Sequence, residues 1–155
     1  MQVATSETRT GRIMILPITL TFAAVAALMN IWIVMRVGQV RMAEKVANGD
    51  GGNQRVMMRM RAHANFTEYT PFVLILIAAI ELADGWPLGL WVAGAIFFVG
   101  RIAHAFGMDA TGTPSRGRGF GTIATMVVLL GLAGWAITIP YLETRAVPEL
   151  ATAHG

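Results

Sequence analysis

A short stretch, residues 59–71, places cationic, amide and carboxylate side chains at the start of a long apolar run. At about 100° per residue, Arg61, Asn65 and Glu68 fall within an arc of about 60° on one helix face. Glu68 would lie roughly 10 Å further along the helix axis than Arg61. A glutamate inside a membrane costs several kcal/mol unless it is paired, so this face must meet a partner or a water-filled cavity.

Two interpretations of this polar face are open. In the first, Arg61 and Glu68 are bridged through Asn65, and the three side chains satisfy one another and hold helices together. In the second, the face lines a pocket for a small polar ligand. Arginine would bind a carboxylate through two hydrogen bonds, and the asparagine would form hydrogen bonds with a peptide-like amide. The glutamate would accept a hydrogen bond from an ammonium or amide group. A short zwitterionic peptide would satisfy all three.

Further basic side chains are expected at the same depth. Arg101 and His104 lie in the last third of another apolar run, and Arg116 and Arg118 precede the next one. Cations there outnumber the nearby carboxylates, which suggests that a ligand supplies the missing anion. For Arg116 and Arg118, contact with lipid phosphates is the alternative.

The histidines give no sign of a metal centre. His63, His104 and His154 do not have metal-ligand spacing, so no metal site is predicted. His63 projects about 160° away from Arg61 on a helix and is expected at an interface or facing a loop.

The composition indicates that lipid is the solvent. Of the 155 residues, 55% are apolar and only 14% are charged, whereas soluble domains carry about 25% charged residues. The chain has no cysteine, so disulfides and a cysteine nucleophile are excluded, and any thiol must come with a substrate. Eleven of the twelve basic residues are arginine and lie beside apolar runs, which argues against nucleic-acid binding.

Four apolar runs predict an all-α integral membrane protein, a four-transmembrane-helix bundle forming one domain over residues 1–155. Each run reaches roughly the 20 residues that a helix needs to cross about 30 Å of hydrocarbon. The spans are expected at about 13–35, 62–83, 86–108 and 119–142. Arg9 and Arg12 precede the first run, so a cleaved signal peptide is the alternative there, but the length of the run favours a retained anchor.

The segments between the spans predict the orientation of the bundle. Nine basic residues lie between spans one and two or around the link between spans three and four, and three lie on the opposite side. This bias places both termini on the non-cytoplasmic side. The glycine-rich residues 48–52 predict a turn, Glu81 and Asp84 are expected at a solvated helix end, and small residues four apart, such as Gly117 and Gly121, at close helix contacts.

Residues 61–71, Arg-Ala-His-Ala-Asn-Phe-Thr-Glu-Tyr-Thr-Pro, resemble the second-helix signature of the MAPEG family, the membrane-associated proteins of eicosanoid and glutathione metabolism. That signature is Arg-Ala-x-x-Asn-x-x-Glu-Tyr-x-Pro. Chain length, the four spans and the basic loops agree as well, so the resemblance extends over nearly the whole chain. It implies a homotrimer that binds glutathione, as cosubstrate, between neighbouring subunits near the cytoplasmic face of a bacterial inner membrane or an equivalent membrane.

The resemblance also implies a set of glutathione-binding residues: Arg36, Arg61, His63, Asn65, Glu68, Tyr69, Arg101 and His104. Of these, His63 and Arg36 would reach the ligand from an adjacent subunit. His104 and Met108 stand where the eicosanoid enzymes have tyrosines. The catalytic arginine would be Arg118 or Arg116, a choice that the loop lengths leave open, with Arg118 preferred.

The implied chemistry is that of a glutathione transferase or peroxidase acting on a lipophilic small molecule from the bilayer. A free thiol has a pKa of about 8.5, so only a few per cent is thiolate at neutral pH. A guanidinium in a poorly solvated site lowers the pKa of a thiol and favours the nucleophilic thiolate. The alternative is a non-catalytic membrane ligand-binding or scaffold protein of the same fold, because the family contains a member that only presents lipid.

Overall fold

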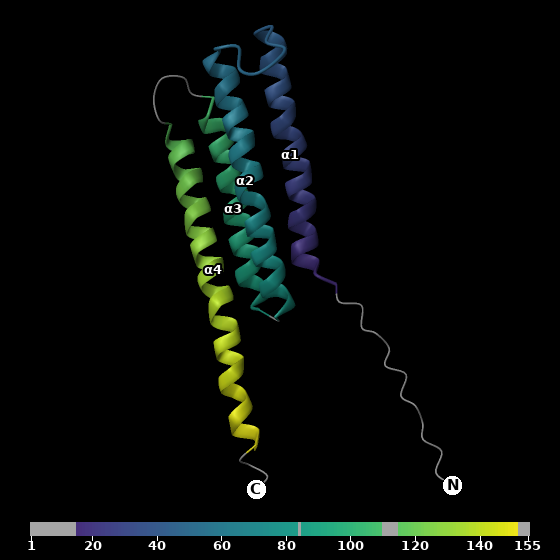
Figure 1. Cartoon of the computed structure of the whole chain (residues 1–155), viewed down its shortest axis with the longest axis vertical. Helices are drawn as coiled ribbons and strands as arrows, with labels where there is room; N and C mark the ends of the chain where they lie inside the picture. The colour runs from purple at the N-terminus through teal and green to yellow at the C-terminus, as the bar shows by residue number, and fades with distance from the viewer. Residues whose placement is uncertain (1–14, 84, 110–114, 152–155) are drawn as a thin grey trace, which may run out of the picture.

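The computed structural model describes residues 15–83, 85–109 and 115–151, with side chains described as far as Leu142 (Figure 1). These residues form the helices α1 (Pro17–Ala43), α2 (Gln54–Leu82), α3 (Pro87–Gly107) and α4 (Arg116–Ala151). Each helix contains a stretch long and apolar enough to cross a membrane. The predicted all-α four-helix membrane bundle is therefore confirmed.

The helices extend beyond the expected spans, mostly at the end that carries the basic residues. Helix α1 runs past residue 35 to Ala43, and α2 begins at Gln54 rather than at 62. Helix α4 begins at Arg116 and continues to Ala151, beyond the expected 119–142, whereas α3 differs from its expected span by one residue at each end. Hydropathy detects only the part of a helix that lipid surrounds, and polar helical turns outside it escape detection.

The connection between α1 and α2 is a compact turn, as predicted for residues 48–52. Its left-handed backbone positions include three glycines, which adopt positive φ at no steric cost: Gly49, Gly51 and Gly52. The Asp50 carboxylate accepts from the N–H of Gly52 at 3.0 Å. Asn53 caps α2 with its side-chain oxygen and donates through its amide to Glu44 at 2.9 Å.

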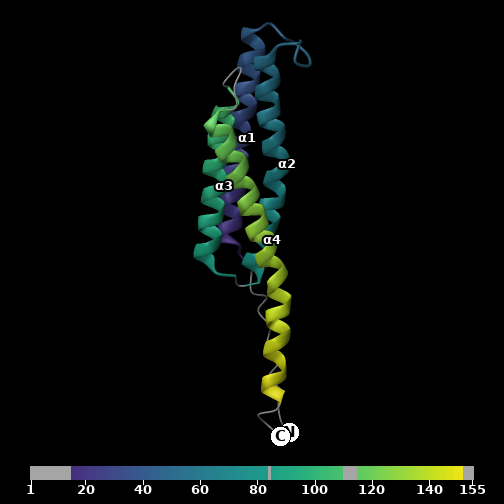
Figure 2. The ribbon, with the colours of Figure 1, turned by 90° about the vertical axis from the view of Figure 1, so that its left-hand side faces the viewer.

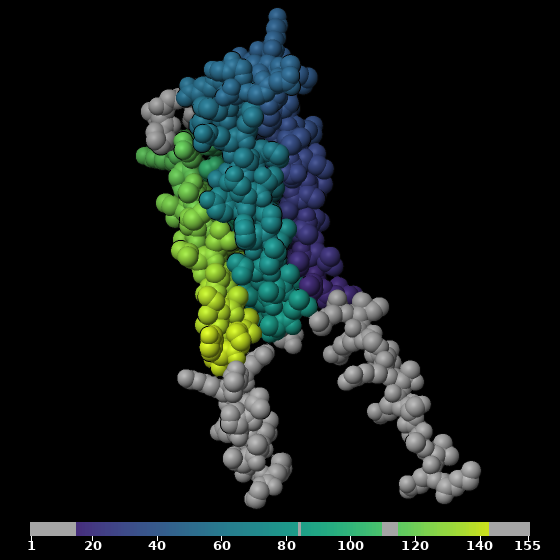
Figure 3. Space-filling model, in the orientation of Figure 1, coloured from purple at the N-terminus to yellow at the C-terminus, as the bar shows by residue number. Residues whose placement is uncertain are grey.

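The bundle consists of two antiparallel pairs, α1 with α2 and α3 with α4. Helix α2 also contacts α3 and α4, while α1 touches α3 but, among the described residues, not α4 (Figures 1 and 2). In the space-filling view, α2 crosses the visible face with α4 and α1 on either side (Figure 3). Phe22, Ile77 and Phe97 belong to the apolar core, and Leu28 and Leu130 are exposed where lipid would surround the helices.

Glycines let α3 and α4 approach so closely that their backbones touch. A Cβ atom on Gly107 would lie 2.2 Å from the backbone nitrogen of Arg118, and one on Gly121 would lie 2.3 Å from the carbonyl oxygen of Gly100. A Cβ on Gly117 would lie 2.8 Å from the carbonyl oxygen of Ala103. The predicted small-residue contact is therefore confirmed for these helices, and it fixes His104 of α3 against the first turns of α4.

At the opposite end of the bundle, Glu81 ties α2 to α1. Its carboxylate accepts from the backbone N–H groups of Ile18 and Thr19 at 2.9 and 2.8 Å, and from the Thr19 hydroxyl at 2.7 Å. The expectation of a solvated helix end is therefore wrong for Glu81. The first N–H groups of a helix lack intrahelical partners, and a carboxylate there also meets the positive end of the helix dipole. Asp84 lies outside the described residues.

Candidate functional site

A cavity of about 860 Å³ lies between α2, α3 and α4, at the end of the bundle that carries the α1–α2 turn. In Figure 2 the start of α4 lies against α3 and apart from α2, whereas the middle of α4 approaches α2. Residues from three helices and the turn line the cavity: Gly49, Asp50, Met57, Met60, Arg61, Ala64, Asn65, Glu68, His104, Met108, Arg118 and Thr122. Its α2 wall follows helical spacing, so one face of that helix forms it.

The three polar residues predicted to share a face of α2 all line this cavity. Arg61 and Glu68 are exposed and Asn65 is half-buried. Within the described parts of the chain, none of the three side chains has a hydrogen bond or an ion pair. The interpretation in which they satisfy one another therefore does not hold in this structure. Together with Arg118 they form what we call the open cluster.

Helix α4 distinguishes the two arginines that the sequence left as alternatives. Arg118 lines the cavity, whereas Arg116, two residues away and thus on the other side of the helix, does not. Nδ1 of the buried His104 lies 3.4 Å from the carbonyl oxygen of Arg118 and 3.5 Å from the hydroxyl of Thr122. A carbonyl oxygen can only accept, so Nδ1 of His104 is the donor in this contact.

Arg36, expected to reach a ligand in a neighbouring subunit, is instead paired within its own chain. Its guanidinium forms an ion pair with Asp109 and lies 4.9 Å from the ring centre of Trp32 and 4.7 Å from that of Phe106. Arg59 donates to Asp109 at 2.9 Å and to the carbonyl oxygen of Arg36 at 2.8 Å. We call Arg36, Arg59 and Asp109 the paired cluster.

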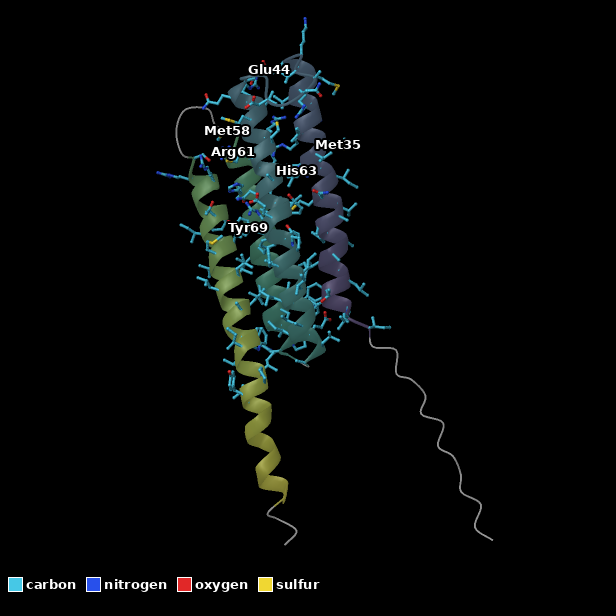
Figure 4. The ribbon with its side chains drawn as sticks, viewed as in Figure 1. Met35, Glu44, Met58, Arg61, His63 and Tyr69 are labelled. Carbon is cyan, nitrogen blue, oxygen red and sulfur yellow. The ribbon has the colours of Figure 1, made fainter. Side chains whose placement is uncertain are left out.

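His63 and Tyr69 do not line the cavity either. Figure 4 shows Arg61 on the side of α2 that faces α4 and His63 on the side that faces α1. Nε2 of His63 lies 2.9 Å from the side-chain oxygen of Asn30. Tyr69 is half-buried and packs against the apolar core. A contact between His63 and the ligand of a neighbouring subunit stays a prediction.

Arg101 lies behind the cavity wall rather than in it. Its side chain is 2% exposed, and Nε, Nη1 and Nη2 have no hydrogen-bond partner among the described residues. It precedes His104 by three residues, so it lies about one helical turn deeper in the bundle. Its electrostatic neighbours include Tyr69 of α2.

Some residues of the cavity were not among the sequence-based candidates. Thr122 follows Arg118 by four residues, so helical periodicity would have indicated it. Asp50 reaches the cavity only because the α1–α2 turn folds back over the start of α2, and no local pattern indicates this. The described residues include no group of three or more histidine, aspartate or glutamate side chains that could hold a metal ion.

Comparison with known proteins agrees with the four-helix membrane fold. The model of the MAPEG family matches residues 19–138. The chain is also 29% identical over 86 residues to the inner membrane protein YecN of Escherichia coli (strain K12), and to the same degree to YecN of Escherichia coli O6:H1 (strain CFT073). Each match covers 56% of this chain and 66%, just under two thirds, of the relative. The family match spans most of the chain, and the protein therefore belongs to the MAPEG family, as an integral membrane protein of four helices.

Proposed function

We propose that this protein binds glutathione in the cavity and transfers its thiol to lipophilic electrophiles, or uses it to reduce hydroperoxides. The observation that carries the proposal is the open cluster. Two arginines, an amide and a carboxylate line one cavity of about 860 Å³, and the α2 members lack partners within the described residues. A volume of this size is in the range of small-molecule sites, about 300 to 1,000 Å³.

The open cluster matches the functional groups of a zwitterionic tripeptide. In the proposal, Arg61 binds a carboxylate through two parallel hydrogen bonds, and Asn65 pairs with a peptide amide. Glu68 accepts from the α-ammonium group. Arg118, across the cavity on α4, then lies near the remaining part of the ligand, which carries the thiol.

Arg118 is proposed to promote ionisation of the thiol. A guanidinium stabilises the thiolate in a partly desolvated site and lowers the pKa of the thiol. With an electrophile, the sulfur lone pair forms the C–S bond and the leaving group departs with its electron pair, or an activated double bond takes up a proton. With a hydroperoxide, the thiolate takes the terminal oxygen and releases the alcohol. A second glutathione then converts the sulfenic acid into a disulfide and water.

We also propose a homotrimer in which a neighbouring subunit completes the cavity. The exposure of Arg61 and Glu68 in the single chain supports this arrangement. Because Arg36 and His63 have partners in their own chain, the proposal assigns ligand binding first to the open cluster. The relatives named inner membrane proteins support a location in a bacterial inner membrane or its equivalent. Helix α1 begins and α4 ends at one end of the bundle (Figure 1), which we assign to the non-cytoplasmic side.

A second candidate is a non-catalytic membrane protein that binds the same ligand or acts as a scaffold. The observation that favours it is the presence of His104 and Met108 on the cavity wall. The family's eicosanoid enzymes have tyrosines at these positions, and a thioether does not donate a hydrogen bond as a phenol does. The ligand would then be held without the hydroxyl groups that those enzymes offer.

One experiment on the detergent-solubilised full chain separates the two candidates. Glutathione binding is measured by equilibrium dialysis, and conjugation is measured in the same preparation with chlorodinitrobenzene and with a lipid hydroperoxide. Binding with turnover supports the enzyme, and binding without turnover supports the scaffold. Absence of glutathione binding contradicts the enzyme and the ligand-binding form of the second candidate.

A further inference from the structure

The guanidinium of Arg101 is the least satisfied polar group that the structure describes. It is 2% exposed, inside a membrane-spanning helix, and all three of its nitrogens lack a hydrogen-bond partner among the described residues. Buried polar groups nearly always have partners, and an unpaired charge in such an environment costs several kcal/mol. The folded protein must therefore hold an acceptor at this position.

The acceptor does not come from the polar side chains known to lie near Arg101. His104, one turn away, directs Nδ1 at the start of α4, and no hydrogen bond joins its ring to the guanidinium among the described residues. Tyr69 is an electrostatic neighbour, but no hydrogen bond joins its hydroxyl to the guanidinium in the described parts of the chain. The guanidinium on α3 thus lacks an acceptor among the described residues.

A neighbouring subunit cannot reach this guanidinium from outside, because the single chain already buries it. Water would accept hydrogen bonds but would leave the positive charge uncompensated. The surrounding charges do not compensate it either, since Arg118 is also cationic and Glu68 lies on the cavity side of the wall. A small anion supplies both the acceptor and the charge.

We propose that Arg101 binds a compact inorganic monoanion of the chloride class inside the bundle. The site lies one turn below the wall formed by His104 and is separate from the cavity proposed for glutathione. It neutralises the buried guanidinium of α3, so it is a structural site rather than a part of the reaction.

The first test uses bromide as the probe and contains no glutathione, so its result does not depend on the proposed function. Thermal unfolding of the detergent-solubilised protein is followed while sodium bromide replaces sodium gluconate at constant ionic strength. Binding to the folded state predicts a saturable stabilisation. At a bromide concentration 100 times the Kd, the ratio of folded to unfolded protein should rise about a hundredfold. A flat response would overturn the proposal.

Two substitutions make this test specific. Arg101→Met removes the charge but keeps much of the volume, so the variant should fold without the anion and lose the bromide response. Arg116→Met, which removes an exposed arginine outside the cavity, should keep the whole response. Equal responses in the wild type and in Arg101→Met would contradict the assignment.

A crystal of the wild-type protein grown in bromide locates the anion directly and needs no variant. The anomalous difference map should show a peak within hydrogen-bond distance of the Arg101 guanidinium, and the peak should persist when glutathione is added. A peak that glutathione displaces, or a protein carboxylate, tyrosinate or water at that position, would overturn the proposal.

Discussion

Two groups of arginines lie at the same end of the bundle, and they differ in what satisfies them. In the paired cluster, Arg36 and Arg59 share the carboxylate of Asp109, and Arg36 also lies against two aromatic rings. In the open cluster, Arg61 has no such partner among the described residues and faces a cavity instead. The same residue type therefore has two roles, which differ in whether an ion pair with a carboxylate forms within the described residues. The paired cluster fastens helices, and the open cluster is available to a ligand.

The largest effect is expected from the close contact between α3 and α4, which positions Arg118 opposite α2. We call this contact the glycine seam; it consists of Gly100, Gly107, Gly117 and Gly121. Gly121→Ala places a Cβ 2.3 Å from the carbonyl oxygen of Gly100, so the backbones of α3 and α4 must separate. We expect a loss of about 3 kcal/mol in the free energy of unfolding, measured by denaturation in detergent, together with weaker ligand binding at the open cluster. Gly119→Ala, where nothing lies within 4 Å, is the matched control and should not destabilise the protein. If the two variants behaved alike, the seam would not position the cluster.

Asp109→Asn tests whether the paired cluster is structural. Arg36 is buried and would lose its counter-charge, while Arg59 would lose a 2.9 Å contact. Breaking a buried pair costs about 3–5 kcal/mol, and we expect about 2 kcal/mol here because the Asp109 side chain is 33% exposed. Glutathione binding should not change. A stable variant with impaired binding would assign the paired cluster to the ligand site.

Arg118→Ala separates binding from activation within the open cluster. The variant should retain glutathione, because Arg61, Asn65 and Glu68 remain, but the ultraviolet absorbance of the bound thiolate should fall at least about tenfold. A tenfold change corresponds to about 1.4 kcal/mol of differential stabilisation of the anion. Arg116→Ala is the control and should leave the signal intact. A full thiolate signal in Arg118→Ala would refute the role proposed for this arginine.

The smallest effect is expected at the far end of the bundle, where Glu81 caps α1. Glu81→Gln keeps one acceptor oxygen but loses the charge and one of the bonds to the first turn. We expect a loss of about 1 kcal/mol in the free energy of unfolding and no change in glutathione binding. Thermal unfolding of the variant beside the wild type measures the loss. A loss of binding would mean that the open cluster is coupled to the whole bundle.

The sequence predicted the features that depend on a single helix. Four apolar runs indicated four membrane helices, and helical periodicity placed Arg61, Asn65 and Glu68 on one face. The features that join distant parts of the chain could not be predicted in this way. Arg36 and Asp109 are 73 residues apart, and Glu81 lies 62 residues from Thr19. Such pairs become visible only when the helices are packed.

The choice between Arg116 and Arg118 shows the same limit. Periodicity places the two residues on different faces of α4, but it does not reveal which face meets the cavity. The rotation of α4 is set by its close contact with α3, where Gly107 leaves room for the backbone nitrogen of Arg118. Arg101 was predicted to be a ligand-binding residue, but its type and position do not reveal that its guanidinium is buried without a hydrogen-bond partner among the described residues.

The central claim is that Arg61, which has no partner among the described residues, binds the ligand, and that Arg59, which is paired with Asp109, does not. Isothermal titration calorimetry of glutathione against the wild type, Arg61→Ala and Arg59→Ala in detergent tests it most directly. The two substitutions remove the same side chain from positions two residues apart on α2, so they differ only in the cluster that loses it. We predict that Arg61→Ala abolishes binding and that Arg59→Ala retains the wild-type affinity. Unchanged affinity in Arg61→Ala, or an equal loss in both variants, would contradict the account.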